Sequence, residues 1–291
     1  MPVIPVNGIR LAYRDVGDGP PVVLIMGAGA TGSAWHLHQV PALVAAGHRA
    51  ITFDNRGIQP DGLNGPKDPD DPAARGFTVH DLVADVAGLI TQLDLAPSAV
   101  VGTSLGARVA AELALTRPDL VGALVLMAAR GRSDPLHTAL SLAERELDDR
   151  EIELPPRYRA VVKALTELSP RGFADEQALT DWLEVFELAP PPGPAVCAQR
   201  RLYPMPDRLD AYRRIDAPCH VIAFADDVMA PPAVGREVAA AVPGASFEVI
   251  EGCGHLGYLE RPEAVNRALL EFLRASVPAG TDRSPRKENR R

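Results

Sequence analysis

The stretch VVGTSLGA, residues 100–107, decides the fold class of this chain of 291 residues. An apolar run typical of a buried strand leads into it, and a segment with the composition of a helix follows Ser104. A Gly-x-Ser-x-Gly pentapeptide between a strand and a helix predicts a sharp, strained turn that raises the serine oxygen above a sheet, at the positive end of the helix. Gly102 and Gly106 let the strand and the helix approach closely. Ser104 is therefore our candidate nucleophile.

Strand and helix signals alternate on both sides of this turn. After a hairpin at 3–15, strands are predicted at 21–26, 48–54, 98–102, 120–128, 219–224 and 246–251. Helices are predicted at about 33–46, 77–94, 104–116, 232–241 and 262–275. This alternation is typical of an α/β fold in which a mostly parallel, doubly wound sheet carries helices on both faces.

The alternation stops between residues 132 and 213, where helical patterns are separated by proline-rich segments. We therefore predict a core of residues 1–131 and 214–276 with a helical cap, or lid, inserted at 132–213. The cap should lie at the carboxyl edge of the sheet, because the strand before it ends there. The polar segment 277–291 is expected to be a disordered tail. The Gly-, Pro- and Asp-rich segment 55–76 is predicted to be a long loop, with a solvated surface excursion at 65–75.

A serine alcohol needs a base and an orienting acid to act as a nucleophile at neutral pH. Of the seven histidines, only His255 lies in a glycine-rich loop after a late strand, in EGCGHLGYLERPE. Asp226 and Asp227 directly follow the preceding strand, in FADDVMAPP. The chain order serine, aspartate, histidine is the order expected of a nucleophile-elbow hydrolase.

Over roughly residues 3–275 these motifs resemble the α/β-hydrolase superfamily, specifically its capped serine hydrolases, and the Ala-, Arg- and Pro-rich composition resembles actinobacterial members. In that family the acid lies in Gly-x-x-Asp-x-x-x-Pro, and aligning this motif with residues 224–231 selects Asp227 over Asp226. Some members place the acid one strand earlier, where Asp134 is a distant candidate.

The resemblance also implies an oxyanion hole made by two backbone N–H groups, those of Leu105 and Ala28. The family usually has His-Gly-x at the second position, whereas this chain has Met26-Gly27-Ala28. How this turn is fixed without the histidine is left open by the sequence.

These features predict a serine hydrolase that cleaves an ester, lactone or thioester of a small to medium, largely apolar substrate through an acyl-enzyme. Trp35, Trp182 and Phe186 are candidates for the substrate pocket, although packing of cap on core is the commoner role of such side chains. One alternative is a natural-product tailoring enzyme that performs an elimination or cyclisation with the same triad. Another, from a different class, is a ligand-binding receptor on the same fold.

A competing motif occupies residues 27–32, which fit Gly-x-Gly-x-x-Gly, with Asp54 at the end of the next strand. Alone it would favour an oxidoreductase that binds NAD(P) or FAD. We reject it because the same turn must form the oxyanion hole, and because a dinucleotide site does not explain Ser104, Asp227 and His255. We expect no cofactor and no metal.

The composition sets the remaining expectations. A net charge of −8 and a pI of about 5.4 argue against nucleic acid as a partner. Three cysteines, an odd number, fit a reducing compartment. Without a signal-peptide pattern or a long apolar run, the sequence predicts a cytoplasmic protein that has no membrane contact. The expected partner is a small-molecule substrate, and a homodimer is compatible with the sequence.

Overall fold

The computed structural model describes residues 1–58 and 76–276. The predicted tail at 277–291 and most of the predicted surface loop, residues 59–75, lie outside the described residues.

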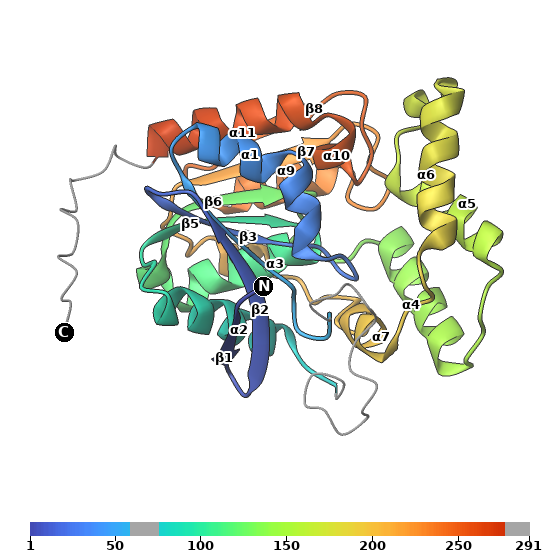
Figure 1. Cartoon of the computed structure of the whole chain (residues 1–291), viewed down its shortest axis with the longest axis horizontal. Helices are drawn as coiled ribbons and strands as arrows, with labels where there is room; N and C mark the ends of the chain where they lie inside the picture. Colours follow the sequence, from blue (N-terminus) through green and yellow to red (C-terminus); the bar gives the residue numbers. More distant parts are fainter. Residues whose placement is uncertain (59–75, 277–291) are drawn as a thin grey trace.

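A single sheet of eight strands forms the centre of the molecule, in the order β1-β2-β4-β3-β5-β6-β7-β8 (Figure 1). The strands are β1 (Val3–Val6), β2 (Ile9–Val16), β3 (Pro21–Ile25), β4 (Arg49–Phe53), β5 (Ser98–Thr103), β6 (Val121–Met127), β7 (Cys219–Phe224) and β8 (Ser246–Ile250). β1 and β2 pair antiparallel, and β2 pairs antiparallel with β4. All other pairs are parallel, so the predicted mostly parallel sheet is confirmed.

Helices cover both faces of the sheet. On one face pack α1 (Gln39–Ala45) and α11 (Pro262–Ser276), and on the other α2 (Val79–Gln92) and α3 (Leu105–Thr116). Within β6, Leu124 and Leu126 join the α2–α3 core, while alternate residues join the opposite core. A strand buried on both faces needs apolar side chains at every position. This explains the unbroken apolar runs in the sequence.

The predicted helix at 33–46 is interrupted. The structure has a 3₁₀ helix at Gly32–Leu37 and then α1, and His38 between them leaves helical geometry with φ −142° and ψ −48°. Pro41 provides the physical reason, because a proline ring clashes with the carbonyl four residues earlier and lacks an N–H. A regular α-helix that continues through Leu37 is therefore disfavoured.

The chain between β6 and β7, whose backbone is described throughout, forms helices and no strand. They are α4 (Pro135–Asp149), α5 (Pro156–Glu167), a 3₁₀ turn (Pro170–Ala174), α6 (Glu176–Leu188), α7 (Pro194–Arg200) and α8 (Leu209–Tyr212). We call this segment the helical insertion. Figure 1 shows α4 to α7 together on one side of the sheet, away from the end of α11. The remaining helices are η2 (Pro118–Leu120), α9 (Pro232–Ala241) and α10 (Gly257–Glu260).

Among the residues that the structure describes, no helix combines the length and the apolarity needed to cross a bilayer.

Candidate active site

Ser104 lies in the turn between β5 and α3 and has a strained backbone. Its φ and ψ angles are 54° and −117°, a combination that a residue with a side chain rarely adopts. The turn is tight, because a Cβ on Gly102 would lie 2.2 Å from the carbonyl oxygen of Gly106. The Ser104 N–H donates to the Met127 carbonyl of the neighbouring strand at 3.0 Å. Packing against β6 thus holds the serine at the start of α3.

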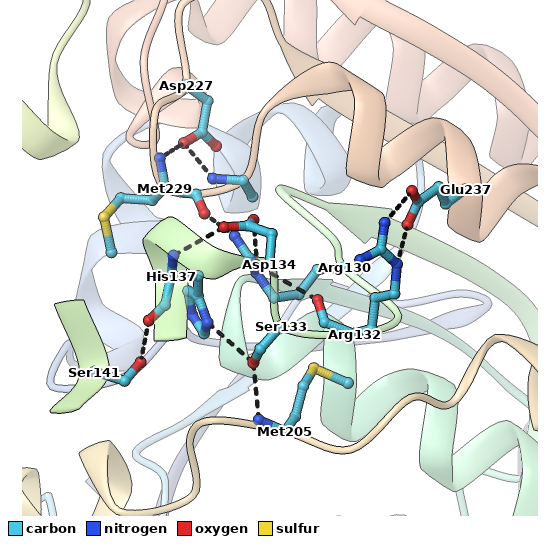
Figure 2. A network of polar contacts seen from close by, with 11 residues as sticks. Arg130, Arg132, Ser133, Asp134, His137, Ser141, Met205, Asp227, Met229 and Glu237 are labelled. Carbon is cyan, nitrogen blue, oxygen red and sulfur yellow. Dashed lines mark hydrogen bonds and ion pairs between the residues drawn. The ribbon is translucent and has the colours of Figure 1, made fainter. Parts of the chain in front are cut away.

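His255 and Asp227 form a buried hydrogen-bonded pair. They follow β8 and β7, and His255 Nδ1 lies 2.8 Å from Asp227 Oδ2. The other carboxylate oxygen, Oδ1, accepts the backbone N–H groups of Met229 and Ala230, each at 2.8 Å. Figure 2 shows this carboxylate above the Met229 backbone. An ionised Asp227 can only accept, so the imidazole carries a proton on Nδ1 and its Nε2 is left as an acceptor.

The surroundings of His255 favour its protonated form. Burial lowers the pKa of the imidazole, but the charge and hydrogen bond of Asp227, with the charge of Glu167, bring the pKa above its ordinary value. A general base needs this kind of support, because it becomes an imidazolium during the reaction.

The two adjacent aspartates have different partners. Asp226 Oδ2 accepts a hydrogen bond from the Ser169 hydroxyl at 2.6 Å and lies 3.3 Å from Arg171 Nε. Both partners belong to the helical insertion. Asp227, the aspartate that the family alignment selects, is therefore the one that contacts His255, whereas Asp226 holds the insertion. The distant candidate Asp134 caps α4 and forms no hydrogen bond with His255 or Ser104.

Ser104 and His255 lie at the same edge of the sheet without being hydrogen bonded. Because β5, β6, β7 and β8 are parallel neighbours, the loops that follow them leave from one edge. Within the described chain no hydrogen bond joins the Ser104 hydroxyl to His255. Contacts of this kind are often longer in a free enzyme than in its substrate complex. The structure thus brings the candidate acid and the candidate base into contact, and the candidate nucleophile onto the same edge.

The two expected oxyanion donors lie on turns that touch each other. Leu105 is the first residue of α3, and Ala28 lies in the turn after β3. A Cβ on Gly27 would be 3.4 Å from the Ser104 Cβ. Within the described part of the chain, neither the Leu105 N–H nor the Ala28 N–H donates to a protein acceptor. Both donors are therefore free to bind a developing negative charge near Ser104.

The turn at Met26 is fixed without the family's histidine. The buried amide of Asn55 donates from Nδ2 to the Met26 carbonyl at 2.8 Å, and Asp54 Oδ1 accepts from the Gly32 N–H at 2.7 Å. Burial raises the pKa of Asp54 to about 6. A dinucleotide site would offer the Asp54 carboxylate to a ribose. Here this carboxylate instead binds the backbone of the glycine-rich turn, at Gly32.

The sequence reasoning missed a polar network centred on Arg130, directly after β6 (Figure 2). The buried guanidinium donates to the Met229 carbonyl and, at 3.1 Å, to Asp134 Oδ2. Asp134 Oδ1 caps α4 by accepting the His137 N–H at 2.8 Å. The network joins the loop of Asp227 to the first turn of the insertion. No local pattern marks such a residue, because its partner at Met229 lies 99 positions away.

His137, also missed, is a neutral imidazole at the start of the insertion. Burial, with the nearby positive charge of Arg130, lowers its pKa to about 4. Its Nδ1 lies 3.2 Å from the Ser133 hydroxyl, which itself accepts the Met205 N–H at 2.9 Å. The Ser133 hydroxyl thus links the imidazole of His137 to the backbone of Met205.

The structure separates the three aromatic pocket candidates. The expectation for Trp35 needs correction, because this side chain is fully buried and packs on Tyr258 with ring centroids 4.9 Å apart. It belongs to the core between the sheet and α1. Phe186 is buried inside the α5–α6 hairpin, and Trp182 lies beside it, partly buried, at 5.4 Å. Leu256, the residue after His255, packs on this cluster.

The insertion also contacts the loop of His255 through its backbone. The Leu256 N–H donates to the Glu167 carbonyl at 3.0 Å. Glu260 accepts the N–H groups of Ser169 and Gly254, at 3.0 and 2.7 Å. The end of α5 is therefore fixed against the segment that carries the candidate base.

The described residues contain no group of three or more His, Cys, Asp or Glu side chains arranged to hold a metal ion. All three cysteines, Cys197, Cys219 and Cys253, are free.

Comparison with known proteins agrees with this fold. A profile described as "Alpha/beta hydrolase family" matches residues 22–268. The protein named "Putative non-heme bromoperoxidase BpoC" from Mycobacterium tuberculosis is 48% identical over 272 residues, which cover 93% of this chain and 100% of BpoC. The crystal structure of BpoC matches with a TM-score of 0.86 at 47% identity, covering 92% of this chain and 97% of that one.

Two more distant relatives carry hydrolase names. A thermophilic esterase from Thermogutta terrifontis is 26% identical, with a TM-score of 0.78 and coverage of 95% of this chain and 99% of that one. A 2-hydroxy-6-oxononadienedioate/2-hydroxy-6-oxononatrienedioate hydrolase from Pseudomonas putida is 28% identical and covers 91% of this chain and 92% of the relative.

Proposed function

Because the chain belongs to the alpha/beta hydrolase family and is a hydrolase, we propose that it cleaves an ester, lactone or thioester with Ser104, His255 and Asp227. The observation that carries the proposal is the 2.8 Å contact between His255 Nδ1 and Asp227 Oδ2, on the sheet edge where Ser104 holds a strained turn. A structural histidine would need neither a buried acid nor a nucleophile on that edge.

In the proposed reaction, His255 Nε2 takes the hydroxyl proton as Ser104 Oγ attacks the substrate carbonyl. Asp227 keeps the second imidazole proton in place and stabilises the imidazolium. The N–H groups of Leu105 and Ala28 stabilise the oxyanion. The leaving group takes the proton from His255, and water, activated by the same imidazole, then releases the acyl group from the serine.

We propose that the helical insertion acts as a cap that forms one wall of the substrate site. Its contacts with Leu256 and Asp226 support this role. The cluster of Phe186 and Trp182, which adjoins Leu256, favours a largely apolar acyl or leaving group.

A second candidate follows from the name of the 48% identical relative, a bromoperoxidase. If hydrogen peroxide rather than water attacks the acyl-enzyme, Ser104 leaves and a peroxy acid is released. The peroxy acid can then oxidise bromide to hypobromous acid and return to the carboxylic acid. A third outcome is elimination or cyclisation of a natural product, for which the triad transfers a proton without a lasting acyl-enzyme.

One experiment separates hydrolysis, peroxide-dependent bromination and binding without turnover. The purified protein is given p-nitrophenyl esters of graded chain length, with water alone or with hydrogen peroxide and bromide, and the products are identified by mass spectrometry. Hydrolysis requires equimolar acid and p-nitrophenol, both lost in Ser104→Ala. Bromination of an added acceptor that depends on peroxide and on Ser104 would favour the second candidate. If every ester binds and none is turned over, the proposed function is wrong and a receptor role gains support.

A further inference from the structure

Gln199, on α7 of the helical insertion, is a fully buried side chain whose amide joins two loops of the core. Its Oε1 accepts the Gly29 N–H at 2.8 Å, and its Nε2 donates to the Arg56 carbonyl at 2.9 Å. Both ends of the amide are therefore satisfied by backbone groups of the core. A buried amide bonded at both ends has a defined position, because breaking either bond leaves a polar group without a partner.

The Gly29 contact acts on the turn of the proposed oxyanion hole. Ala28 lies between two fixed points: the Met26 carbonyl, held by Asn55, and the Gly29 N–H, held by Gln199. The first point belongs to the core and the second to the insertion. The direction of the Ala28 N–H is thus set in part by a residue of α7.

The other end of the amide is attached to a rigid anchor. The Arg56 side chain forms a bidentate pair with Asp85, at 2.9 and 2.6 Å, and both side chains are buried. Because the Arg56 backbone cannot easily follow a movement of α7, the amide of Gln199 keeps its place only when α7 is docked.

Packing reinforces the same contact. Gly29 has a φ of +72°, and a Cβ there would lie 3.2 Å from a methyl group of Val196, also on α7. The turn therefore lies directly against the helix. A displacement of α7 would remove the Gln199 bond and this packing together.

We propose that Gln199 is a positioning residue that completes the oxyanion hole when α7 docks on the core. The proposal rests on the proposed function, because it assigns a role in the same site. Docking of the insertion would thus fix the direction of the Ala28 N–H, so that the oxyanion hole is complete only when the cap is closed. A lid that only excludes water would need no such bond.

The test begins with Gln199→Met, which keeps the length of the side chain and removes both hydrogen bonds. We expect kcat for a p-nitrophenyl ester to fall about 10²-fold, the loss typical when one oxyanion donor is misplaced, with KM changed less than about threefold. Affinity for butylboronic acid, which forms a tetrahedral anion on serine, should fall by a similar factor. The acid limb of the pH profile should not move, because His255 is untouched.

Gln39→Met is the matched control. Gln39 is also a fully buried glutamine, and its Nε2 donates to the Tyr258 carbonyl at 2.8 Å, on the face of the sheet that α1 and α11 cover. It should lower the melting temperature as Gln199→Met does, while kcat stays within about threefold of the wild type.

Gln199→Glu supplies a second readout that a packing role would not produce. A neutral carboxyl can still accept from the Gly29 N–H and donate to the Arg56 carbonyl, whereas a carboxylate cannot donate. Burial raises the pKa of a carboxyl, so kcat relative to wild type should be highest at low pH and fall as the pH rises. This variant keeps the test decisive if Gln199→Met fails to fold.

Three results would each overturn the inference. The first two are a folded Gln199→Met with wild-type kcat and a Gln199→Met in which only KM changes. The third is a Gln199→Glu whose kcat relative to wild type is independent of pH. Failure of the proposed function looks different, because the wild-type protein itself would then show no turnover that depends on Ser104.

Discussion

Replacing Asp227 by asparagine should switch the imidazole of His255 to its other tautomer. The reason lies on the far side of the carboxylate, where Oδ1 accepts the N–H groups of Met229 and Ala230 at 2.8 Å each. In Asp227→Asn the amide oxygen will keep that place, so the NH₂ group faces His255 Nδ1. The ring must then accept at Nδ1 and carry its proton on Nε2, where it cannot take the proton of Ser104.

The magnitude follows from the cost of turning the amide around. The reversed orientation leaves two N–H groups unsatisfied, one buried and one partly buried, at about 1–3 kcal/mol each. The resulting bias of about 2–6 kcal/mol corresponds to a loss of about 30-fold to 10⁴-fold in kcat, at about 1.36 kcal/mol per factor of ten. We expect the upper end, about 10⁴, which is the loss typical of this substitution in a serine triad.

The assay is steady-state hydrolysis of a p-nitrophenyl ester, with circular dichroism to show that each variant is folded. Asp226→Asn is the matched control, because Asp226 contacts Ser169 and Arg171 instead of the imidazole. It should lose less than about tenfold. A larger loss in Asp226→Asn, or less than a tenfold loss in a folded Asp227→Asn, would refute the assignment of the acid.

Three further results are expected. The kcat/KM of the wild type should fall as the pH drops through the raised pKa of His255, because the imidazole must be neutral to act as a base. Asp227→Asn should move this acid limb of the pH profile to lower pH, because it removes the charge that raises the pKa. Gly106→Ala should lower the free energy of unfolding in urea by more than about 3 kcal/mol, because its Cβ would lie 2.2 Å from the Ile25 carbonyl oxygen. In Gly122→Ala, the control, the new Cβ would be 3.4 Å from the nearest atom, and the loss should be under about 1 kcal/mol. Phe186→Ala should lower stability by about 3 kcal/mol and shift chain-length preference more than labelling of the nucleophile by a fluorophosphonate.

Much of the fold could be predicted because its signals are local. A strand covered on both faces is apolar at every position, and an amphipathic helix repeats every three to four residues. Thr78 is the N-cap of α2 and forms a capping box with Asp81, three residues later, which is a signal of the same local kind. The strand–turn–helix at Ser104 combines these signals with two glycines whose Cβ atoms would clash with backbone.

What the sequence could not provide depends on contacts between distant residues. Gln199 and Arg130 have no local pattern, since each is defined by backbone groups that folding brings to it. The seven-residue helix α7 is too short to show a periodicity. Trp35 shows the same limit, because an aromatic residue of the core and one of a binding site look the same in sequence.

The central claim is that Ser104 is the nucleophile, and covalent labelling tests it most directly. The protein is treated with a fluorophosphonate, digested and analysed by tandem mass spectrometry. We predict one label per chain, located on Ser104 and absent from Ser104→Ala. Labelling of another residue, or an equal extent of labelling in Ser104→Ala, would contradict the account.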